Sequence, residues 1–227
     1  MATPLTDDGN QVHAAIIPQL VGFLISAGVR GLFVGGTTGE GILLPAGQRR
    51  LLHEKTIKAV AGRVPVLIHV GAIETATATT LAVHAQEIGA DGLVAVAPYF
   101  YPLHEAARLD YFQAVAAAAS HTPFFAYDIP HMAVNGVSPA MVQQMGATIP
   151  NFAGVKTSHG DAQHIRALID AAPAGTLVLA GNERSALGSL ALGAHGLISG
   201  LSTAVPEPFV TLTQAMMAGD LETARAT

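Results

Sequence analysis

The chain of 227 residues contains no cysteine and no tryptophan, and only 12% of its residues are charged. The lack of cysteine excludes a disulfide framework and catalysis by a thiolate. The net charge is −5 and lysine and arginine form no cluster, which argues against nucleic acid and anionic membranes as partners. No apolar run reaches membrane-spanning length without interruption, and the polar first ten residues lack the pattern of a signal peptide. We therefore expect a soluble cytoplasmic protein.

Hydrophobic residues make up 50% of the chain, which is ample material for a large core. No linker or low-complexity segment divides the sequence, so we expect residues 1–227 to form a single domain. The low proportion of charge also suggests that part of the surface is buried between subunits.

Short apolar runs alternate with longer alanine-rich amphipathic runs. We expect strands at 31–35, 66–70, 92–96, 124–128, 152–156, 177–180 and 196–200, and helices at 14–27, 45–60, 75–88, 104–119, 138–146, 161–171, 184–192 and 206–218. Mostly apolar strands are typical of a parallel sheet covered on both faces. The alternation fits either an open doubly wound sheet or a closed (β/α)8 barrel. Polar residues follow many different strands, which favours the barrel because its loops converge on one mouth.

Lysine occurs at only three positions, and Lys156 differs from the other two. Lys55 and Lys58 lie in a polar, helix-like stretch, whereas Lys156 ends the apolar run 151–156. A lysine at the end of a buried strand is costly, because loss of water disfavours the ammonium form. Burial would leave a free amine able to attack a carbonyl and form a Schiff base. The alternative is a strand-end lysine whose amine reaches solvent or an acidic partner.

Two other predicted strands end in polar motifs. Gly36, Thr37 and Thr38 belong to the segment GGTTGEG, whose backbone amides and hydroxyls could hold a carboxylate, although an ordinary tight turn explains the glycines equally well. The segment is neither a Walker loop nor a complete dinucleotide fingerprint. Tyr127 ends the strand 124–128, where its hydroxyl could relay protons or simply cap the barrel.

The ten histidines are scattered along the chain, and none shows a zinc-binding spacing. We therefore expect no metal. His131 and His159 follow the strands of Tyr127 and Lys156, so they are candidates for the mouth of a barrel.

Five segments, in this order, resemble the dihydrodipicolinate synthase/N-acetylneuraminate lyase family of class I aldolases. They are Thr3-Pro4, Gly35–Glu40 (GGTTGE), Tyr127–Pro130 (YDIP), Gly154–Asp161 (GVKTSHGD) and Gly193–Ser199 (GAHGLIS). The resemblance implies a (β/α)8 TIM barrel, usually a homotetramer, that binds pyruvate as a Schiff base without a metal or organic cofactor.

The resemblance also implies a role for each matching residue. Lys156 is expected to form the Schiff base, and Tyr127 to shuttle protons at the imine and the aldol hydroxyl. Thr37 and Thr38 are expected to hold the pyruvate carboxylate and to connect to the tyrosine. Ile198 matches a residue whose backbone faces pyruvate. The chemistry agrees, because a protonated imine is an electron sink for bond cleavage at the neighbouring carbon.

Some positions depart from the family pattern. Met132 stands where synthases carry an arginine, which favours the lyase-like side of the family. Phe100 stands where many members have a tyrosine that reaches a neighbouring subunit, so that contact is lost or moved to Tyr101. Asp128 replaces the usual asparagine and is expected to add a negative charge to the site.

The segment from Gly181 to Arg184 matches the place where sialic acid lyases bind the polyol tail of their substrate. Glu183 keeps an acidic group there, while Arg184 reverses the sign expected beside it. This combination favours a sugar acid other than sialic acid.

Both ends of the chain are shorter than the family pattern. By this alignment most of the first strand and the carboxy-terminal helical segment are missing, so we expect a barrel truncated at both ends. Such a barrel exposes two sheet edges.

The sequence thus predicts a carbon–carbon lyase, a pyruvate-dependent aldolase that cleaves or forms a 2-keto-3-deoxy sugar acid or a related 2-oxo acid. One alternative is 4-hydroxy-tetrahydrodipicolinate synthase, which condenses pyruvate with aspartate semialdehyde. Another is an inactive truncated barrel or a non-catalytic binding protein.

Overall fold

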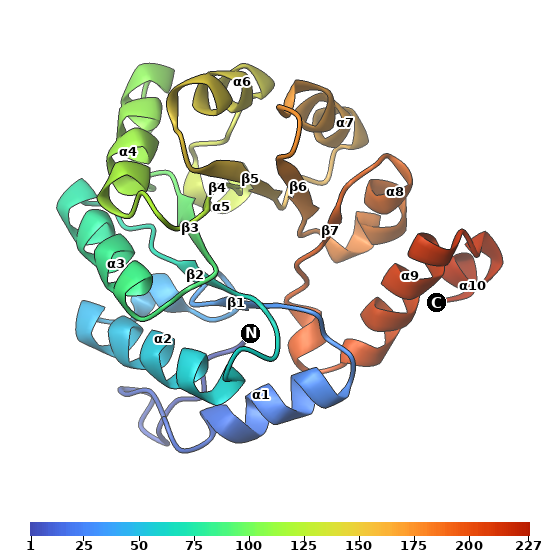
Figure 1. Ribbon diagram of the computed structural model, residues 1–227, viewed down its shortest axis with the longest axis horizontal. Helices are drawn as coiled ribbons and strands as arrows, with labels where there is room; N and C mark the ends of the chain where they lie inside the picture. The colour runs from blue at the N-terminus through green and yellow to red at the C-terminus, as the bar shows by residue number, and fades with distance from the viewer.

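Seven parallel strands form one curled sheet with helices around its outside, as the computed structural model of residues 1–227 shows (Figure 1). The strands are β1 (Leu32–Val34), β2 (Val66–His69), β3 (Gly92–Val96), β4 (Phe124–Asp128), β5 (Phe152–Thr157), β6 (Leu177–Ala180) and β7 (Gly196–Leu197). They pair in sequence order from β1 to β7, and no ladder joins β7 back to β1. The predicted α/β architecture of barrel type is confirmed, as a seven-stranded curled sheet.

Each strand connects to the next through helical segments, as parallel pairing requires. The α-helices are α1 (Ile17–Ser26), α2 (Ala46–Val60), α3 (Thr75–Glu87), α4 (Glu105–Ala118), α5 (Pro130–Ala133), α6 (Pro139–Thr148), α7 (Ala162–Ala171), α8 (Ala186–Ala191), α9 (Pro206–Ala218) and α10 (Leu221–Ala226), with short 3-10 helices at Gly41–Leu43, Glu183–Ser185 and Leu201–Thr203. The predicted helix 184–192 is a 3-10 turn followed by α8. The prediction missed α5 and α10, because four and six residues are too few to show helical periodicity.

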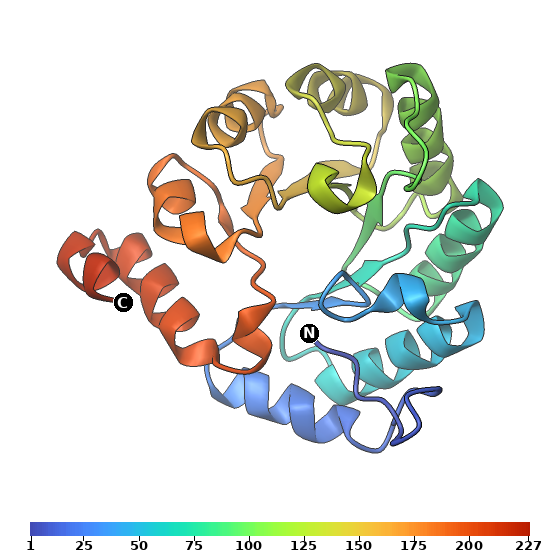
Figure 2. The ribbon, with the colours of Figure 1, turned by 180° about the vertical axis from the view of Figure 1, so that it is seen from behind.

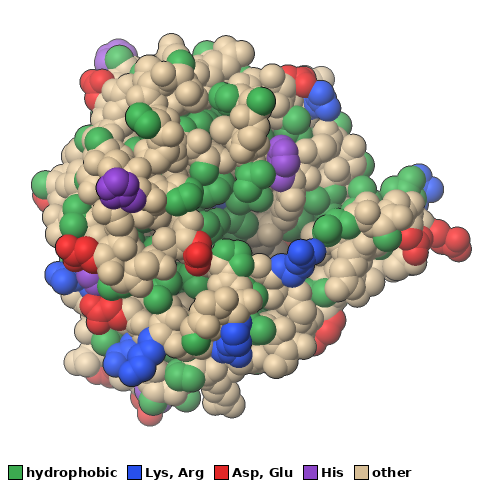
Figure 3. All heavy atoms as spheres, in the orientation of Figure 1, with side chains coloured by type: hydrophobic (Ala, Val, Ile, Leu, Met, Phe, Trp, Pro, Cys, Tyr) green, Lys and Arg blue, Asp and Glu red, His purple; other side chains and the backbone are tan.

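Alternate residues of the strands supply two separate cores, because successive side chains point to opposite faces. In β4, Phe124 and Ala126 join a cluster of 34 buried residues between the sheet and the helices. Phe125 and Tyr127 join a smaller cluster inside the ring of strands. Seen from the side of Figure 1, hydrophobic side chains line the hollow at the centre of the molecule (Figure 3). This smaller cluster, with the ring of His69 against Phe33 and Tyr127, fills space enclosed by the strands.

Gly154 shapes the strand that carries Lys156. Its φ is +147°, and a Cβ there would overlap the backbone of Leu177 on β6. The pairing of β4 with β5 shifts register at this level, between Phe124 and Phe125. A glycine therefore lets β5 bulge and still pair closely on both sides.

The first residues lie beside β1, near the middle of the ring in both views (Figures 1 and 2). The amine of Met1 donates to the carbonyl of Phe33 at 2.8 Å, and the hydroxyl of Thr3 donates to the carbonyl of Gly39 at 2.5 Å. These contacts brace the glycine-rich loop that follows β1. No helix of the chain is both long enough and apolar enough to span a membrane.

Candidate active site

The predicted site residues come together in one cavity of about 270 Å³ at the carboxyl ends of the strands. Short α5 lies over this end of the ring, in front in Figure 2. The cavity lining includes all eight predicted residues: Gly36, Thr37, Thr38, Tyr127, Lys156, Gly181, Glu183 and Ile198. They come from the ends of β1, β4, β5, β6 and β7, which explains why no single motif reveals the site.

Lys156 is the central side chain of the cavity, and the residue is only 4% exposed. Its Nζ donates to Oγ of Ser158 at 2.5 Å and lies 3.9 Å from the ring centroid of Tyr127. Burial lowers the pKa of Lys156, and it outweighs the opposite effects of Tyr127, Glu183 and Asp128. The neutral amine, which is the nucleophilic form, is therefore favoured.

The hydroxyl of Tyr127 lies 3.0 Å from Oγ1 of Thr37, within hydrogen-bond distance. The tyrosine is buried, and its ring meets that of Phe33 edge to face at 5.9 Å. Two strands and one loop thus place an amine, a phenol and an aliphatic hydroxyl in contact. Such a chain can move a proton between the loop and the amine.

Ser158 was not singled out from the sequence, although it contacts the amine directly. Residues two apart in a strand point to the same face, so a polar residue two places after Lys156 is the signal that could have found it. The hydroxyl of Ser158 accepts a hydrogen bond from the amine and fixes its position.

The loop after β1 offers unpaired donors toward the cavity. The backbone amides of Thr37 and Thr38 make no hydrogen bond within the chain, and both residues line the cavity. A Cβ at Gly36 would overlap the ring of Phe33, and one at Gly200 would overlap the side chain of Thr38. Glycine at these two positions lets the loops after β1 and β7 approach closely. The amides and hydroxyls together form a cradle suited to a carboxylate.

The segment after β6 contributes Gly181 and Glu183. A Cβ at Gly181 would lie 2.5 Å from Nζ of Lys156, so only glycine leaves room around the amine. Oε1 of Glu183 accepts hydrogen bonds from Oγ of Ser199 at 3.0 Å and from the amide of Gly200 at 2.7 Å. Burial acts to raise the pKa of Glu183, but these hydrogen bonds outweigh it and the pKa is lowered. Its carboxylate thereby holds the loop that follows β7.

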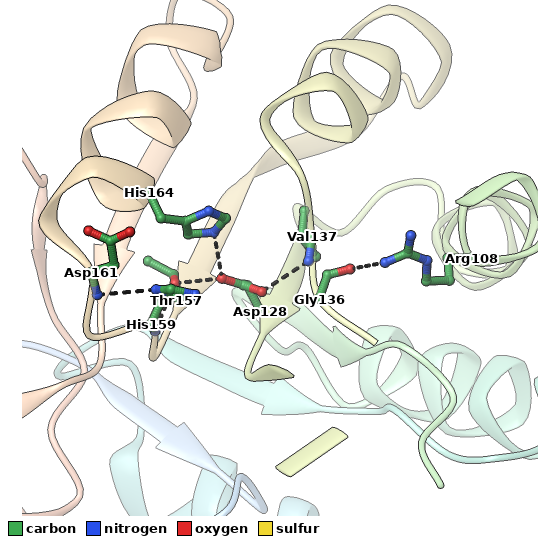
Figure 4. Close-up of polar contacts among 8 residues, drawn as sticks. All are labelled: Arg108, Asp128, Gly136, Val137, Thr157, His159, Asp161 and His164. Atoms are coloured by element: carbon green, nitrogen blue, oxygen red, sulfur yellow. Dashed lines mark hydrogen bonds and ion pairs between the residues drawn. The ribbon is translucent and has the colours of Figure 1, made fainter. Parts of the chain in front are cut away.

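Asp128 requires a correction. Its carboxylate does not line the cavity, because Tyr127 points inward and the next residue of a strand points to the opposite face. The carboxylate accepts from the hydroxyl of Thr157 and faces His164 of α7 on the outside of the strands (Figure 4). No additional negative side chain therefore enters the cavity at this position.

Of the two candidate histidines, only His131 lines the cavity. His131 lines the cavity from α5, together with Met132. His159 does not line it, since its Nδ1 accepts from the amide of Asp161 at 3.1 Å and its ring stacks on His164. Residues three and more beyond a strand end follow the local loop, so their direction could not be predicted from strand alternation.

Phe100 and Tyr101 lie on a different part of the surface, 73% and 68% exposed, and neither lines the cavity. Phe100 has a φ of +81°, an unusual value for a residue with a side chain. No group of three or more histidine or acidic side chains in the chain is arranged to hold a metal ion.

Comparison with known proteins agrees with this geometry. A model of the Dihydrodipicolinate synthetase family matches residues 1–227. The chain is 34% identical over 225 residues to 4-hydroxy-tetrahydrodipicolinate synthase of Neisseria gonorrhoeae, covering 99% of this chain and 76% of that protein.

Solved structures agree in the same way. Sialic acid aldolase of Ruminococcus gnavus superposes with a TM-score of 0.94 at 29% identity, covering 99% of this chain and 74% of that one. YagE, a prophage protein of E. coli K12 solved in complex with pyruvate, superposes with a TM-score of 0.95 at 32% identity, covering 99% and 76%. The chain belongs to the dihydrodipicolinate synthetase family.

Proposed function

We propose that this chain is a pyruvate-dependent class I aldolase or lyase that works through a Schiff base on Lys156. The observation that carries the proposal is the position of the Lys156 amine. It is buried between the hydroxyl of Ser158 and the ring of Tyr127. The hydroxyl of Tyr127 is in turn within hydrogen-bond distance of Oγ1 of Thr37. A buried amine whose pKa is lowered, with a proton carrier beside it, suits imine formation.

The chemistry follows from these groups. The free amine attacks the keto carbon of the 2-oxo acid, and the adduct loses water to give an imine. The protonated imine draws in the electron pair of the bond between carbons 3 and 4, so that this bond breaks and an aldehyde leaves when the hydroxyl on carbon 4 gives up its proton. Tyr127 takes that proton, with Thr37 as the partner of its hydroxyl. The electron pair forms an enamine, which takes up a proton at carbon 3, and water then hydrolyses the imine to release pyruvate and the free amine of Lys156. The amides and hydroxyls of Thr37 and Thr38 hold the carboxylate, and Ile198 lines the same cavity.

For the aldehyde half we propose a neutral, hydroxylated fragment, so that the substrate is a 2-keto-3-deoxy sugar acid or a related 2-oxo acid. The cavity lining contains Met132 but no arginine, so no guanidinium is available there for a second carboxylate. The polar side chains of Ser158, Asn182 and His131 line the cavity and are available to bind hydroxyls. We assign Glu183 a supporting part in this binding, through the loop it holds.

A second candidate is 4-hydroxy-tetrahydrodipicolinate synthase. The Neisseria relative bears that name, which is the observation in its favour. The lack of an arginine around the cavity speaks against aspartate semialdehyde, whose carboxylate is best bound by a guanidinium.

The remaining parts of the proposal concern context. The residues 1–227 act as one domain, without a metal or organic cofactor, on a small-molecule 2-oxo acid. We infer a homo-oligomer, a tetramer or dimer, in the cytoplasm. The exposed pair Phe100 and Tyr101 is our candidate for a subunit contact, because the two rings pack edge to face and contiguous exposed apolar groups mark interaction sites.

Pyruvate release tests the proposal. The purified chain is incubated with a panel of 2-keto-3-deoxy sugar acids, and pyruvate is measured with a coupled dehydrogenase. We expect release from at least one of them and none with Lys156→Ala. Condensation of pyruvate with aspartate semialdehyde would instead favour the synthase. A folded chain inactive in both assays would favour a non-catalytic barrel.

A further inference from the structure

The carboxylate of Asp128 lies behind the strands that carry the reacting groups, and it is held on several sides (Figure 4). Oδ1 accepts from the backbone amide of Val137 at 2.9 Å. Oδ2 accepts from the hydroxyl of Thr157 at 2.7 Å and lies 3.1 Å from Nε2 of His164. The side chain of Asp128 is only 1% exposed. A buried carboxylate with this many partners is firmly oriented.

This carboxylate joins the two strands that carry Tyr127 and Lys156. Tyr127 is paired with Lys156 across β4 and β5, and Asp128 is paired with Thr157 one step further on. The backbone carbonyl of Asp128 also accepts from the amide of Ser158 at 2.8 Å. The position of the amine over the tyrosine ring therefore depends on a clamp made one residue further along each strand.

His164 differs from the other partners of Asp128 because it can change its charge. It comes from α7, and its side chain is 22% exposed, so its ring reaches solvent. The ring stacks on that of His159, with centroids 4.2 Å apart. Imidazoles are the side chains that gain or lose charge between pH 5 and pH 8. Of the side chains that contact the Asp128 carboxylate, His164 is therefore the one that can be either neutral or positively charged.

Other charged groups surround the pair. Lys156 lies on the cavity side. Burial lowers its pKa, and this effect outweighs Tyr127, Glu183 and Asp128, which act to raise it. On α4, Arg108 donates to the carbonyl of Gly136, next to the amide that holds Asp128, and pairs with Glu105 at 3.8 Å.

On the α7 side, the carboxylate of Asp161 caps the helix by accepting from the amide of Gln163. The backbone amide of Asp161 donates to Nδ1 of His159, whose ring lies beside that of His164. Of all these groups, only His164 has a titratable atom within hydrogen-bond distance of the Asp128 carboxylate.

We propose that Asp128 is a positioning residue for the Schiff-base reaction, which clamps Lys156 against Tyr127, and that His164 adjusts the charge that this clamp presents to the amine. This inference rests on the proposed function.

The two residues have opposite electrostatic effects. A carboxylate behind the strand stabilises the ammonium form of Lys156, and an imidazolium on the carboxylate cancels part of that stabilisation. Loss of the carboxylate makes the free amine available at lower pH. Loss of the imidazole leaves the carboxylate uncompensated, so the free amine appears only at higher pH.

The test is the rate at which pyruvate forms a borohydride-trapped adduct, followed by intact mass from pH 5 to pH 9. Asp128→Asn keeps the size of the side chain, and His164→Gln keeps an N–H donor toward Asp128. Asp170→Asn and His121→Gln are matched controls at exposed positions, on the outer side of α7 and before β4. Circular dichroism and melting curves establish that each variant is folded.

We expect the acid limb of the rate profile to move to lower pH in Asp128→Asn and to higher pH in His164→Gln, each by about half a pH unit. The highest rate of Asp128→Asn should also fall about tenfold through poorer alignment, whereas that of His164→Gln should stay within about twofold of wild type. The two controls should match wild type.

The possible failures are distinguishable. A wild-type chain that forms no adduct contradicts the proposed function, and the inference falls with it. An adduct in wild type with the same acid limb in both variants overturns the inference alone. A purely structural role for Asp128 would lower stability without moving the limb, and that result also overturns it. If Asp128→Asn fails to fold, the shift in His164→Gln decides by itself.

Discussion

The amine of Lys156 lies 3.9 Å from the ring centroid of Tyr127, and the hydroxyl of the same tyrosine lies 3.0 Å from Oγ1 of Thr37. One side chain thus packs against the proposed nucleophile and carries the proposed proton donor. These two functions can be separated by substitution.

Tyr127→Phe should keep the ring against the amine and remove only the hydroxyl. We expect turnover to fall about a hundredfold or more, because a positioned acid/base group contributes roughly that much. The borohydride-trapped pyruvate adduct should still form, more slowly. Steady-state kinetics and intact mass measure the two effects, with Tyr111→Phe as a control tyrosine outside the cavity. Undiminished turnover in Tyr127→Phe would exclude the tyrosine as the proton carrier.

Gly181→Ala should disable the site without unfolding the chain. The added Cβ would lie 2.5 Å from Nζ of Lys156 and displace the amine from Ser158. We expect little or no adduct with pyruvate, and a melting temperature close to that of wild type. Gly188→Ala in α8 is the matched control, since a Cβ there has no neighbour within 4 Å. Full adduct formation in Gly181→Ala would mean that the amine occupies another position.

Glu183 links the site to acid stability. The hydrogen bonds that it accepts outweigh burial and keep its pKa below the ordinary value. A carboxyl whose folded-state pKa is lowered stabilises the fold above its unfolded pKa, and this contribution is lost as the pH falls through the folded value. Glu183→Gln should therefore lose less stability than wild type between pH 6 and pH 4, by about 1–2 °C in melting temperature. Parallel pH curves for the two proteins would contradict this assignment.

His53 provides a second, larger test of pH dependence. It is fully buried on α2, and neither ring nitrogen has a hydrogen-bond partner. Burial, with help from Arg49 and His84, lowers its pKa to about 3 from an ordinary value of 6.5. Between pH 6.5 and about pH 3, His53 is protonated in the unfolded chain but neutral in the folded chain. The free energy of unfolding therefore decreases as the pH falls below 6.5.

His53→Leu should therefore remove the part of the acid destabilisation that is due to His53. Between pH 7 and pH 5 the wild type should lose about 2 kcal/mol through His53, or about 4–8 °C in melting temperature, and the variant should lose less by that amount. His121→Leu, at an exposed position, should behave like wild type. If His53→Leu shows the same pH dependence as wild type, His53 is not the group responsible.

Much of the fold was predictable because the buried strands are short and uniformly apolar. The expected ranges for β3 and β4 agree with the structure at both ends, and all five residues of each strand are buried. In β7 only Gly196 and Leu197 are in the ladder, because the chain then turns into the loop that Glu183 holds.

The site was predictable to the extent that strand alternation decides direction. Lys156 and Tyr127 are each the last residue but one of neighbouring strands, and both line the cavity. The same rule places the side chain of Asp128 on the outer face of β4, but the prediction for Asp128 did not take its strand neighbour Tyr127 into account. The prediction overlooked Ser158, although it follows Lys156 at the same spacing of two. The use of Glu183 as a loop anchor depends on contacts between distant segments, which spacing along the sequence does not reveal.

The most direct test of the account is to incubate the chain with pyruvate and borohydride and to locate any adduct by peptide mapping. The account predicts one added pyruvate-derived group per chain, on Lys156, and none in Lys156→Ala. An adduct on Lys55 or Lys58, or no adduct on a folded chain, would contradict it.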